Sequence, residues 1–238
     1  MRVLLVNPPR FQGISVIREE RCEVIERYSV LEPYSLLQIG ALLRQEGIEV
    51  RLIDLNGFKG DYSELDRVLD AFKPDAVVFR FTPTTFDHDM LTAARTKIHD
   101  PSTWTIGICW TLRTMPMSVM RQAPSLDFYV RQDYEAVVPE LIDRLVKGVE
   151  VSSLGGIAFR EAGGTRANLA SAEVADLDLL PIPAFDLLPS LDPTISPLRR
   201  ADPSPSSTPA KGALSIAHSA PLLARFGGPD RRRRWWRS

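Results

Sequence analysis

The stretch Arg2-Val3-Leu4-Leu5-Val6-Asn7-Pro8-Pro9 decides the fold of this chain. An apolar run this short, ended abruptly by Asn-Pro-Pro, is typical of a strand buried on both faces of a parallel sheet. The two prolines cannot continue a strand ladder, so the backbone must leave the sheet at Asn7. We therefore predict a central first strand that opens into a loop at its carboxyl end, which is the edge where open α/β sheets bind ligands.

Strands and helices then alternate along the chain. Apolar runs predict further strands at 49–55, 75–79, 103–108 and 126–130, and helical spacing of apolar residues predicts helices at 33–47, 65–72, 86–98 and 137–146. The polar run 16–25 predicts a helical turn or two above the sheet edge. This alternation indicates an α/β fold over residues 1–150, with a doubly wound parallel sheet of flavodoxin-like (Rossmann-like) strand order. Residues 151–200 are predicted to form a small hairpin around Gly163-Gly164 and a Pro-rich linker.

Composition bounds the class of protein. The chain has 238 residues, 44% hydrophobic and 25% charged, which is enough for one well-buried domain and an appendage. Its two cysteines, Cys22 and Cys109, form no CxxC pair, so we expect no disulfide framework, no zinc or iron-sulfur site, and a cytoplasmic location. No apolar run approaches the ~20 residues of a membrane span, and no signal peptide is recognisable, so we expect neither export nor insertion.

The carboxyl-terminal part has a different character. From Arg199 onward there are nine Lys/Arg against two Asp/Glu, and ten of the 19 prolines lie from Pro181 onward. Residues 201–238 are therefore predicted to be a disordered basic tail. We favour a shifted reading frame as its origin, because it is rich in residues with G- and C-rich codons; the alternative is a basic arm for nucleic acid or anionic lipid.

Loops at the carboxyl ends of the predicted strands should form one crevice. Hydroxyls at Thr82, Thr84 and Thr85 lie beside a predicted helix N-terminus, where phosphate or an amide-rich nucleotide tail can bind; the alternative is that they only cap the helix. Gly107 either lets a ligand approach the fourth strand or serves packing. The candidate binding residues are Asn7, Pro8, Thr82, Pro83, Thr84, Gly107, Cys109, Trp110, Arg131 and Glu135.

Other chemistry is less well supported. His88 lacks partners at metal-ligand spacing, so we interpret it as a surface helix residue and not as a metal or cobalt ligand. Asp133 and Glu135 are two apart, but no nucleophile accompanies them, so a polar loop that hydrogen-bonds a ligand is preferred to an acid/base pair. The first strand has neither the acidic pair of a phosphoacceptor receiver nor the G-x-G-x-x-G of a dinucleotide-binding unit.

Several segments together resemble a known family. They are Arg2 to Pro9, Leu42 to Asp54, Phe72 to Val78, Val130 to Glu135, and the linker Asp176-Leu-Asp-Leu-Leu-Pro-Ile-Pro-Ala-Phe-Asp-Leu-Leu-Pro189. The chain from Met1 to about Arg200 is similar to the N-terminal cobalamin-binding domain of cobalamin-dependent radical S-adenosylmethionine (radical SAM) enzymes. The linker is the most specific of these motifs, because in the family it joins the cobalamin domain to the barrel that holds the iron-sulfur cluster.

This resemblance implies a site at the loops already named. Thr82 to Thr84 and Gly107 to Trp110 would lie near the nucleotide tail and the corrin, and Arg131 to Glu135 at the adjacent edge. The chain departs from the family in two ways. It has Gly107-Ile-Cys-Trp110 where relatives commonly have Gly-Gly-Pro-His, and it has no cysteine after Cys109 and so lacks the CxxxCxxC cluster motif.

The leading hypothesis is the cobalamin-binding domain of a methyltransferase-type radical SAM protein, truncated before its catalytic barrel and inactive alone. Iron-sulfur cluster and S-adenosylmethionine are then expected only in the full-length family. The alternatives are a stand-alone cobalamin carrier or sensor that acts with a partner protein, and a degenerate α/β domain whose basic tail contacts nucleic acid or membrane. Because Asp-x-His-x-x-Gly is absent, we also predict that the nucleotide tail is displaced from cobalt with no histidine taking its place.

Overall fold

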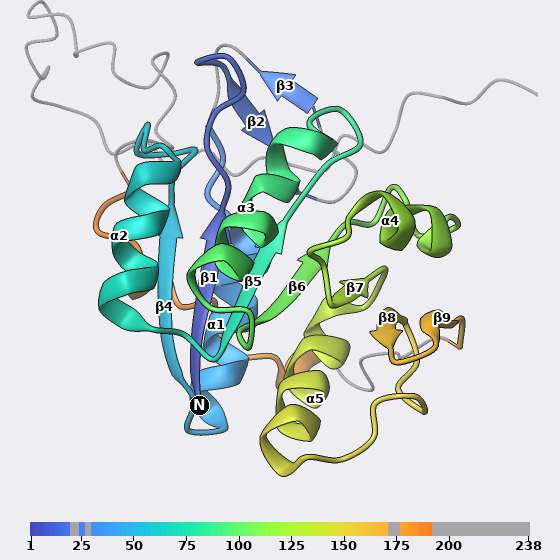
Figure 1. Cartoon of the computed structure of the whole chain (residues 1–238). Helices are drawn as coiled ribbons and strands as arrows, with labels where there is room; N and C mark the ends of the chain where they lie inside the picture. The colour runs from blue at the N-terminus through green and yellow to red at the C-terminus, as the bar shows by residue number, and fades with distance from the viewer. Residues whose placement is uncertain (20–23, 27–29, 171–176, 192–238) are drawn as a thin grey trace, which may run out of the picture. The chain divides into compact units, whose positions relative to one another are not determined.

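The computed structural model describes residues 1–19, 24–26, 30–170 and 177–191. Their main sheet has seven strands in the order β4-β1-β5-β6-β7-β8-β9 (Figure 1). The strands are β1 (Arg2–Asn7), β4 (Glu49–Asp54), β5 (Ala76–Arg80), β6 (Trp104–Ile108), β7 (Phe128–Val130), β8 (Ile157–Glu161) and β9 (Gly164–Asn168). The first five are parallel, and their order confirms the predicted flavodoxin-like, doubly wound sheet.

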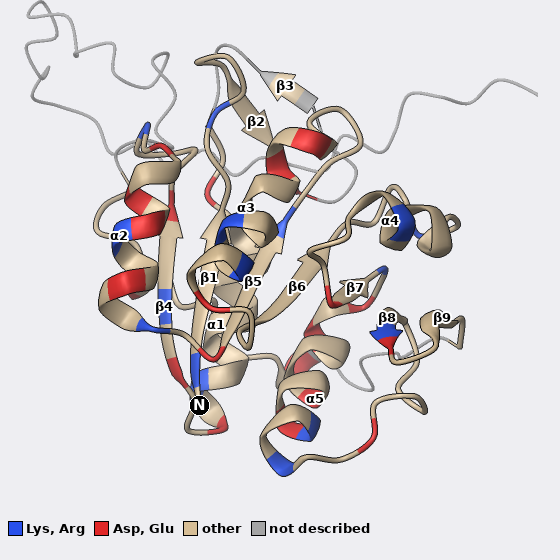
Figure 2. Ribbon diagram, viewed as in Figure 1, with Lys and Arg blue, Asp and Glu red and all other residues tan. Residues whose placement is uncertain are grey.

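Strand β1 is the centre of the fold because it packs on both faces. Val3 and Leu5 belong to one core cluster, and Leu4 and Val6 belong to the other. The first cluster lies under helices α1 (Tyr34–Gln45) and α5 (Tyr134–Lys147), and the second under α2 (Tyr62–Phe72), α3 (Phe86–His99) and α4 (Pro116–Gln122). Figure 2 shows the consequence, since the charged residues lie mainly on helices and loops and the central strands carry few.

The helical turns predicted within residues 16–25 are wrong where the structure describes this segment. There β2 (Ser15–Ile17) and β3 (Val24–Glu26) pair antiparallel, as expected for β-branched residues whose backbone hydrogen-bonds across two strands. The segment before β7 contains a helix, α4, that was not predicted. Its seven residues are too few to show helical periodicity, although Pro116 occupies its first turn.

The predicted hairpin is confirmed as β8 and β9, and it is part of the main sheet. Strand β8 pairs antiparallel with β7, and Arg160 on β8 donates from its guanidinium to the carbonyls of Leu126 (2.8 Å) and Ala123 (2.6 Å). Ala123 ends α4, so this arginine caps the helix. The hairpin therefore supports α4 as well as extending the sheet.

The linker returns to the first helix. The amide nitrogen of Ala184 donates to the carbonyl of Leu37 (3.1 Å), and Gln38 Nε2 donates to the carbonyl of Pro181 (3.0 Å). A Cβ at Gly40 would lie 2.6 Å from Leu187 Cδ1, so this glycine permits the close approach. The 3₁₀ turn η3 (Phe185–Leu187) is thereby held on α1. The predicted tail, 201–238, lies outside the described residues, as do Cys22 and His218.

Candidate functional site

The candidate site lies at the carboxyl edge of the parallel strands. The loops after β1, β5, β6 and β7 all leave the sheet at this edge (Figure 1), and the crossover direction reverses between β1 and β5. In doubly wound sheets this switch point is the usual ligand crevice. Here the edge has two halves of opposite character, one closed around β1 and β5 and one open around β6, β7 and β9.

The closed half is a network that we call the polar cluster: Asn7, Arg18, Asp54, Thr82, Thr85 and Asp89. Each of these residues is at most 5% exposed. Asn7 Nδ2 donates to Asp54 Oδ1 (2.7 Å), and Thr85 Oγ1 donates to Asp89 Oδ2 (2.8 Å). The two predicted residues on β1 and its loop, Asn7 and Pro8, are therefore buried beneath the chain's own side chains.

Arg18 fills the switch point. It follows β2, and its guanidinium donates to both carboxylate oxygens of Asp89 (2.7 and 3.1 Å) and to the carbonyls of Pro8 and Pro9 (2.9 Å each). The Arg18 and Asp89 side chains are 1% and 0% exposed. The Arg18 carbonyl in turn accepts from Arg80 Nε (2.7 Å). A buried ion pair of this kind is stable only while both charges keep their hydrogen bonds, so the crevice is closed by an interior arginine.

Thr82 organises the turn that precedes α3. Its Oγ1 accepts from the backbone nitrogens of Thr84 (3.1 Å) and Thr85 (3.3 Å), and its own nitrogen donates to Asp89 Oδ2 (3.1 Å). The N-cap of α3 is Thr85, whose side chain makes no capping hydrogen bond, so the Thr82 hydroxyl closes a turn ahead of the helix and does not cap it. Pro83 and Thr84 are exposed beside it, so they remain able to meet a ligand.

Asp54 lies at the carboxyl end of β4 and carries a shifted pKa. Burial raises the pKa of this carboxyl above its usual range. Hydrogen bonds from the Gly57 nitrogen (2.8 Å) and from Asn7 oppose that effect, as does the Arg18 charge. Asp54 therefore lies in the interior of the domain, and we expect it to affect stability rather than ligand binding.

Gly107 and Cys109 also face packed interior. A Cβ at Gly107 would lie 3.0 Å from Phe81 Cε1 and 3.1 Å from Leu126 Cδ1, so packing alone accounts for a glycine here. Cys109 is fully buried in the core cluster of α2, α3 and α4, and its carbonyl accepts from Tyr129 Oη (2.7 Å). The contribution of either residue to ligand binding stays a prediction.

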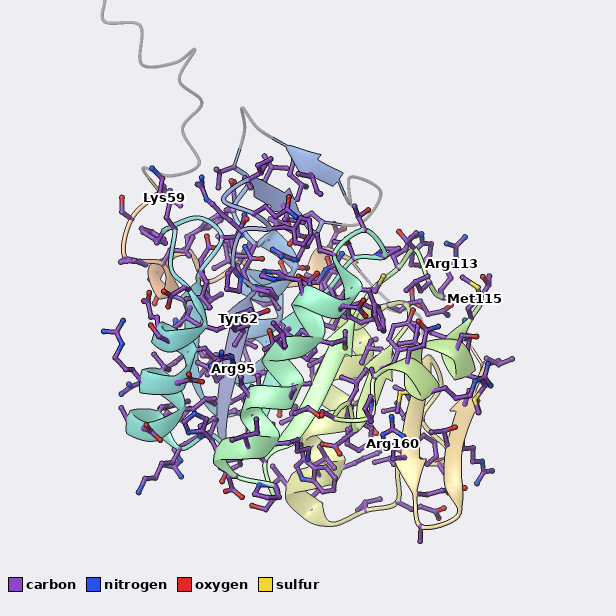
Figure 3. The ribbon with its side chains drawn as sticks, turned by 45° about the horizontal axis from the view of Figure 1, so that its top comes forward. Lys59, Tyr62, Arg95, Arg113, Met115 and Arg160 are labelled. Carbon is purple, nitrogen blue, oxygen red and sulfur yellow. The ribbon has the colours of Figure 1, made fainter. Side chains whose placement is uncertain are left out.

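The open half begins one residue later. Trp110 is partly exposed, and the Arg113 guanidinium carbon lies 4.4 Å from the centroid of its ring. The loop continues through Leu112 to Met115, which is half exposed. Figure 3 shows Arg113 and Met115 together at the end of the edge opposite Lys59. This loop presents apolar surface that the fold leaves in contact with solvent.

Between this loop and the hairpin is a depression that we call the α4–β9 hollow, with a volume of about 620 Å³. It is lined by Thr114, Met115, Pro116, Met117, Ser118, Thr165, Arg166, Ala167 and Leu169. Most of these side chains are apolar, and two are methionines, which adapt readily to irregular ligands. The sequence did not indicate this hollow, because half of its wall comes from a hairpin predicted to be a separate element.

Arg131 lies beside this hollow and holds its walls together. Its guanidinium donates to the carbonyl of Leu169 and, at 3.5 Å, to the carbonyl of Arg113, thus joining the ends of β9 and of the β6–α4 loop to β7. The residue is only 8% exposed. Within the described part of the chain its Nε–H faces no acceptor. Glu135, predicted with it, lies in the first turn of α5 and is partly buried.

The histidines do not approach the open half. His88 lies in the first turn of α3, with ring contacts to Phe11 and Tyr62 at centroid distances of 5.6 and 5.4 Å. His99 ends the same helix and faces Asp66 and Asp70 on α2 at 3.2 and 3.0 Å. The described ranges contain no group of three or more His, Cys, Asp or Glu that could hold a metal ion. They also contain no helix with the length and apolar character to cross a membrane.

Solved structures of two radical SAM enzymes have a fold similar to that of this chain. The radical SAM methyltransferase TsrM of Kitasatospora setae, solved with cobalamin and a [4Fe-4S] cluster, matches with a TM-score of 0.55 and 19% identity over 73% of this chain and 30% of that one. The cobalamin-dependent S-adenosylmethionine radical enzyme OxsB, solved with aqua-cobalamin and S-adenosylmethionine, matches with a TM-score of 0.59 and 21% identity over 78% of this chain and 24% of that one. These matches show a common fold.

One similarity extends to sequence. A protein of Pyrococcus horikoshii described as an uncharacterized methyltransferase is 27% identical over 190 residues, which cover 79% of this chain and 39% of the relative. The chain thus spans about two-fifths of that relative's length. No protein-family model matches it. The structures that share its fold are cobalamin-dependent radical SAM enzymes, in agreement with the resemblance seen in the sequence.

Proposed function

We propose that this chain is a cobalamin-binding domain that serves methyl-transfer chemistry of the radical SAM type. The observation that carries the proposal is the open half of the carboxyl edge. There this chain, whose fold is similar to those of TsrM and OxsB, leaves an apolar loop and a mostly apolar hollow uncovered, at the edge where doubly wound sheets bind ligands. Exposed apolar surface of this kind commonly marks a binding site.

The exposed groups suit cobalamin chemically. The cofactor has a broad apolar corrin fringed with amides, so it needs flat apolar contacts and scattered hydrogen-bonding groups. Trp110, Leu112 and Met115 offer the former, and the Thr84 hydroxyl, which is exposed, offers the latter. Pro83, exposed beside Thr84 at the border of the polar cluster, and Arg131 are further predicted residues that we expect near the ligand. Asn7 and Pro8 would contribute only by shaping the buried polar cluster.

The same geometry supports binding without a protein ligand to cobalt. His88 is held between Phe11 and Tyr62, and His99 faces carboxylates on α2, so neither described histidine is at the open half. When bound, cobalamin supplies a cobalt centre that can carry a methyl group. The protein's part is to seat the corrin and to exclude bulk water from the side it covers.

Radical chemistry would need groups beyond these residues. The sequence has two cysteines, one of them the buried Cys109, so these 238 residues offer no set of three cysteines for an iron-sulfur cluster. We propose that a cluster-bearing barrel or partner protein provides the cluster and S-adenosylmethionine. A carrier or sensor function is the second candidate, and it is favoured by the same shortage of cysteines.

Titration with hydroxocobalamin tests the proposal. We expect one equivalent to bind, with a change in the visible absorption of the corrin and co-elution of cofactor and protein on size exclusion. Absence of both signals at millimolar cofactor would contradict it. Pull-down of a cluster-bearing protein by the cobalamin-loaded chain, absent without cobalamin, would then favour the carrier over the domain of a single enzyme.

A further inference from the structure

The main sheet ends at β9, and the outer edge of this strand is unpaired within the described part of the chain (Figure 1). The register determines which backbone groups face outward. Glu161 and Gly164 are opposite each other across a two-residue turn, so each donates a backbone hydrogen bond to the other. The Arg160 nitrogen donates to the residue before β7 (3.0 Å), which agrees with this alternation. The N–H and C=O groups of Thr165 and Ala167 therefore point away from β8 and leave two donors and two acceptors at the edge.

Unpaired edges accept further strands unless charged side chains, prolines or bulges protect them. The opposite edge of the sheet, β4, is protected in this way, because Glu49 and Arg51 are exposed along it. The pairing of β9 has no bulge, and the strand contains no proline and a single charge, Arg166. An extended segment of another chain can pair with such an edge through main-chain hydrogen bonds, and its alternate side chains then give specificity.

The surroundings of β9 carry positive charge without acidic partners. Residues 110–122, which include α4, and residues 164–170 contain no Asp or Glu and three arginines, Arg113, Arg121 and Arg166. Within the described ranges, none of the three forms an ion pair with a carboxylate. Opposite charges on directly opposed residues of neighbouring strands are favourable. Arg166 therefore selects an acidic residue in an added strand.

The side chains of β9 alternate in character, so those of an added strand must alternate too. Ala167 packs against the core cluster under α4, and Thr165 shares its face of the sheet. Leu169, which is 63% exposed, follows two residues later beside the α4–β9 hollow. Arg166 lies between Thr165 and Ala167 in the strand and is exposed. Apolar residues of the added strand would be opposite Thr165 and Ala167, and an acidic residue would be opposite Arg166.

A second copy of this chain is a poor partner for the edge. Antiparallel pairing of two β9 strands uses all four outward groups of each copy only when Thr165 is opposite Ala167, and this register places Arg166 opposite its own counterpart. Like charges in that position are destabilising.

We propose that β9 binds an extended segment of another protein, with alternating apolar and acidic residues, as an eighth strand of the sheet. The added strand is antiparallel to β9, because antiparallel pairs are slightly more stable per residue than parallel ones. This interaction goes beyond the proposed function, because it requires no cobalamin.

Two fluorescein-labelled heptapeptides test the proposal, one alternating valine with glutamate and the other valine with lysine. In fluorescence anisotropy, the full chain should bind the glutamate peptide about tenfold more tightly than the lysine peptide, and Arg166→Glu should reverse this preference. Thr165→Pro removes an outward N–H that has no partner in the described sheet, so it should weaken binding of the glutamate peptide with little change in melting temperature. Arg67→Glu, at an exposed position of α2, is the control and should change neither affinity.

Methylated peptides test the pairing itself. Methylation of the valine nitrogens, which face β9 in the antiparallel register, should abolish binding, and methylation of the glutamate nitrogens should not. Binding that persists after methylation of the valine nitrogens would show that no such strand is added.

The remaining outcomes are equally decisive. Equal affinity for the glutamate and lysine peptides, or no binding of either, would overturn the assignment of an acidic partner to β9. A dimer on size exclusion that Thr165→Pro converts to a monomer would assign the edge to a second copy and overturn the proposal. Titration of the same samples with hydroxocobalamin judges the proposed function separately, because the peptide result does not depend on the cofactor.

Discussion

The two halves of the carboxyl edge use arginine in opposite ways. In the polar cluster, Arg18 is neutralised by Asp89 and directs its remaining donors to the Pro8 and Pro9 carbonyls, so that it is part of the interior. Around the α4–β9 hollow, Arg113, Arg131 and Arg166 have no carboxylate partner among the described residues. The first half is closed by the chain's own side chains, and the second leaves apolar and basic side chains such as Met115 and Arg166 exposed.

This difference separates the crevice that doubly wound sheets commonly use from the site that we propose for this chain. The switch point between β1 and β5 is the usual crevice of doubly wound sheets, but β2 carries Arg18 into it. Burial of a charge is favourable only with full hydrogen bonding, which Arg18 and Asp89 achieve together. A ligand that entered there would have to break this pair. Binding at the far end of the edge costs no such rearrangement.

Removing Asp89 should have the largest effect on stability. Asp89→Ala leaves Arg18 buried without its counter-charge, and breaking a buried ion pair in this way costs about 3–5 kcal/mol. Urea denaturation followed by circular dichroism measures the loss. Asp87→Ala, at an exposed position in the same helical turn, is the control and should cost under about 1 kcal/mol. A similarly small loss for Asp89→Ala would mean that the polar cluster is not the closed interior described here.

Enlarging Gly107 should have the next largest effect. Its new methyl group would meet Phe81 and Leu126, and overpacking of this kind costs about 1–3 kcal/mol. The loss in Gly107→Ala should appear in the free energy of unfolding without any cofactor present. Gly163→Ala has open space around the new Cβ and serves as the control. If Gly107→Ala keeps full stability but loses cobalamin affinity, the glycine faces the ligand and the boundary between the halves must move.

Trp110→Ala should separate binding from stability. The ring is partly exposed and its main described partner is Arg113, so its removal should cost only about 0.5–1 kcal/mol of stability, the range of an exposed cation–π contact. Loss of an apolar surface for the corrin should weaken cobalamin binding by about tenfold, which corresponds to about 1.4 kcal/mol. Trp104→Ala, a more exposed tryptophan at the start of β6, is the control for affinity. Unchanged affinity in Trp110→Ala would exclude the β6–α4 loop from the site.

The smallest expected effect is the contribution of Asp54 to the pH dependence of stability. Because burial raises its pKa above 3.8, the folded chain retains this proton to a higher pH than the unfolded chain does. The stability that Asp54 contributes is therefore full below pH 3.8 and declines as the pH rises through the raised pKa. Asp54→Asn keeps the acceptor for Asn7 and does not titrate. The measured quantity is the free energy of unfolding of the unchanged chain minus that of Asp54→Asn. This difference should fall as the pH rises from 3.8 through the raised pKa. A rise would show that the hydrogen bonds to Asp54 lower its pKa by more than burial raises it.

Much of the fold could be predicted because it depends on local periodicity. The apolar run before Asn7, the alternation of strands with helices, and Gly163-Gly164 in the hairpin all report backbone structure within a few residues. The predictions of secondary structure failed where contacts between distant segments determine the local structure. The strand β2 is stabilised by Asn56, forty residues away, whose Oδ1 accepts from the Val16 nitrogen at 2.8 Å. No pattern within residues 16–25 encodes that contact.

The site could be predicted only as a set of loops. Their meeting at one edge follows from the parallel topology, which periodicity indicates. Which loop side chains remain accessible depends on Arg18, Phe81 and Leu126, whose positions are set by packing between distant segments. Arg113 and Arg166 were missed for the same reason, because the hairpin that carries Arg166 joins the sheet only through β8. A run of exposed methionine and arginine around Met115 was the one signal that could have indicated the hollow.

Hydrogen–deuterium exchange with and without hydroxocobalamin tests the division of the edge most directly. Saturation with the cofactor should slow exchange in the peptides that contain Trp110 to Ser118 and Thr165 to Ala170. Peptides from Asn7 to Arg18 and at Thr82 should exchange slowly in both states, with no added protection, because the polar cluster is already closed. Protection that appears around Asn7 and Arg18, and is absent from the β6–α4 loop and β9, would contradict the account.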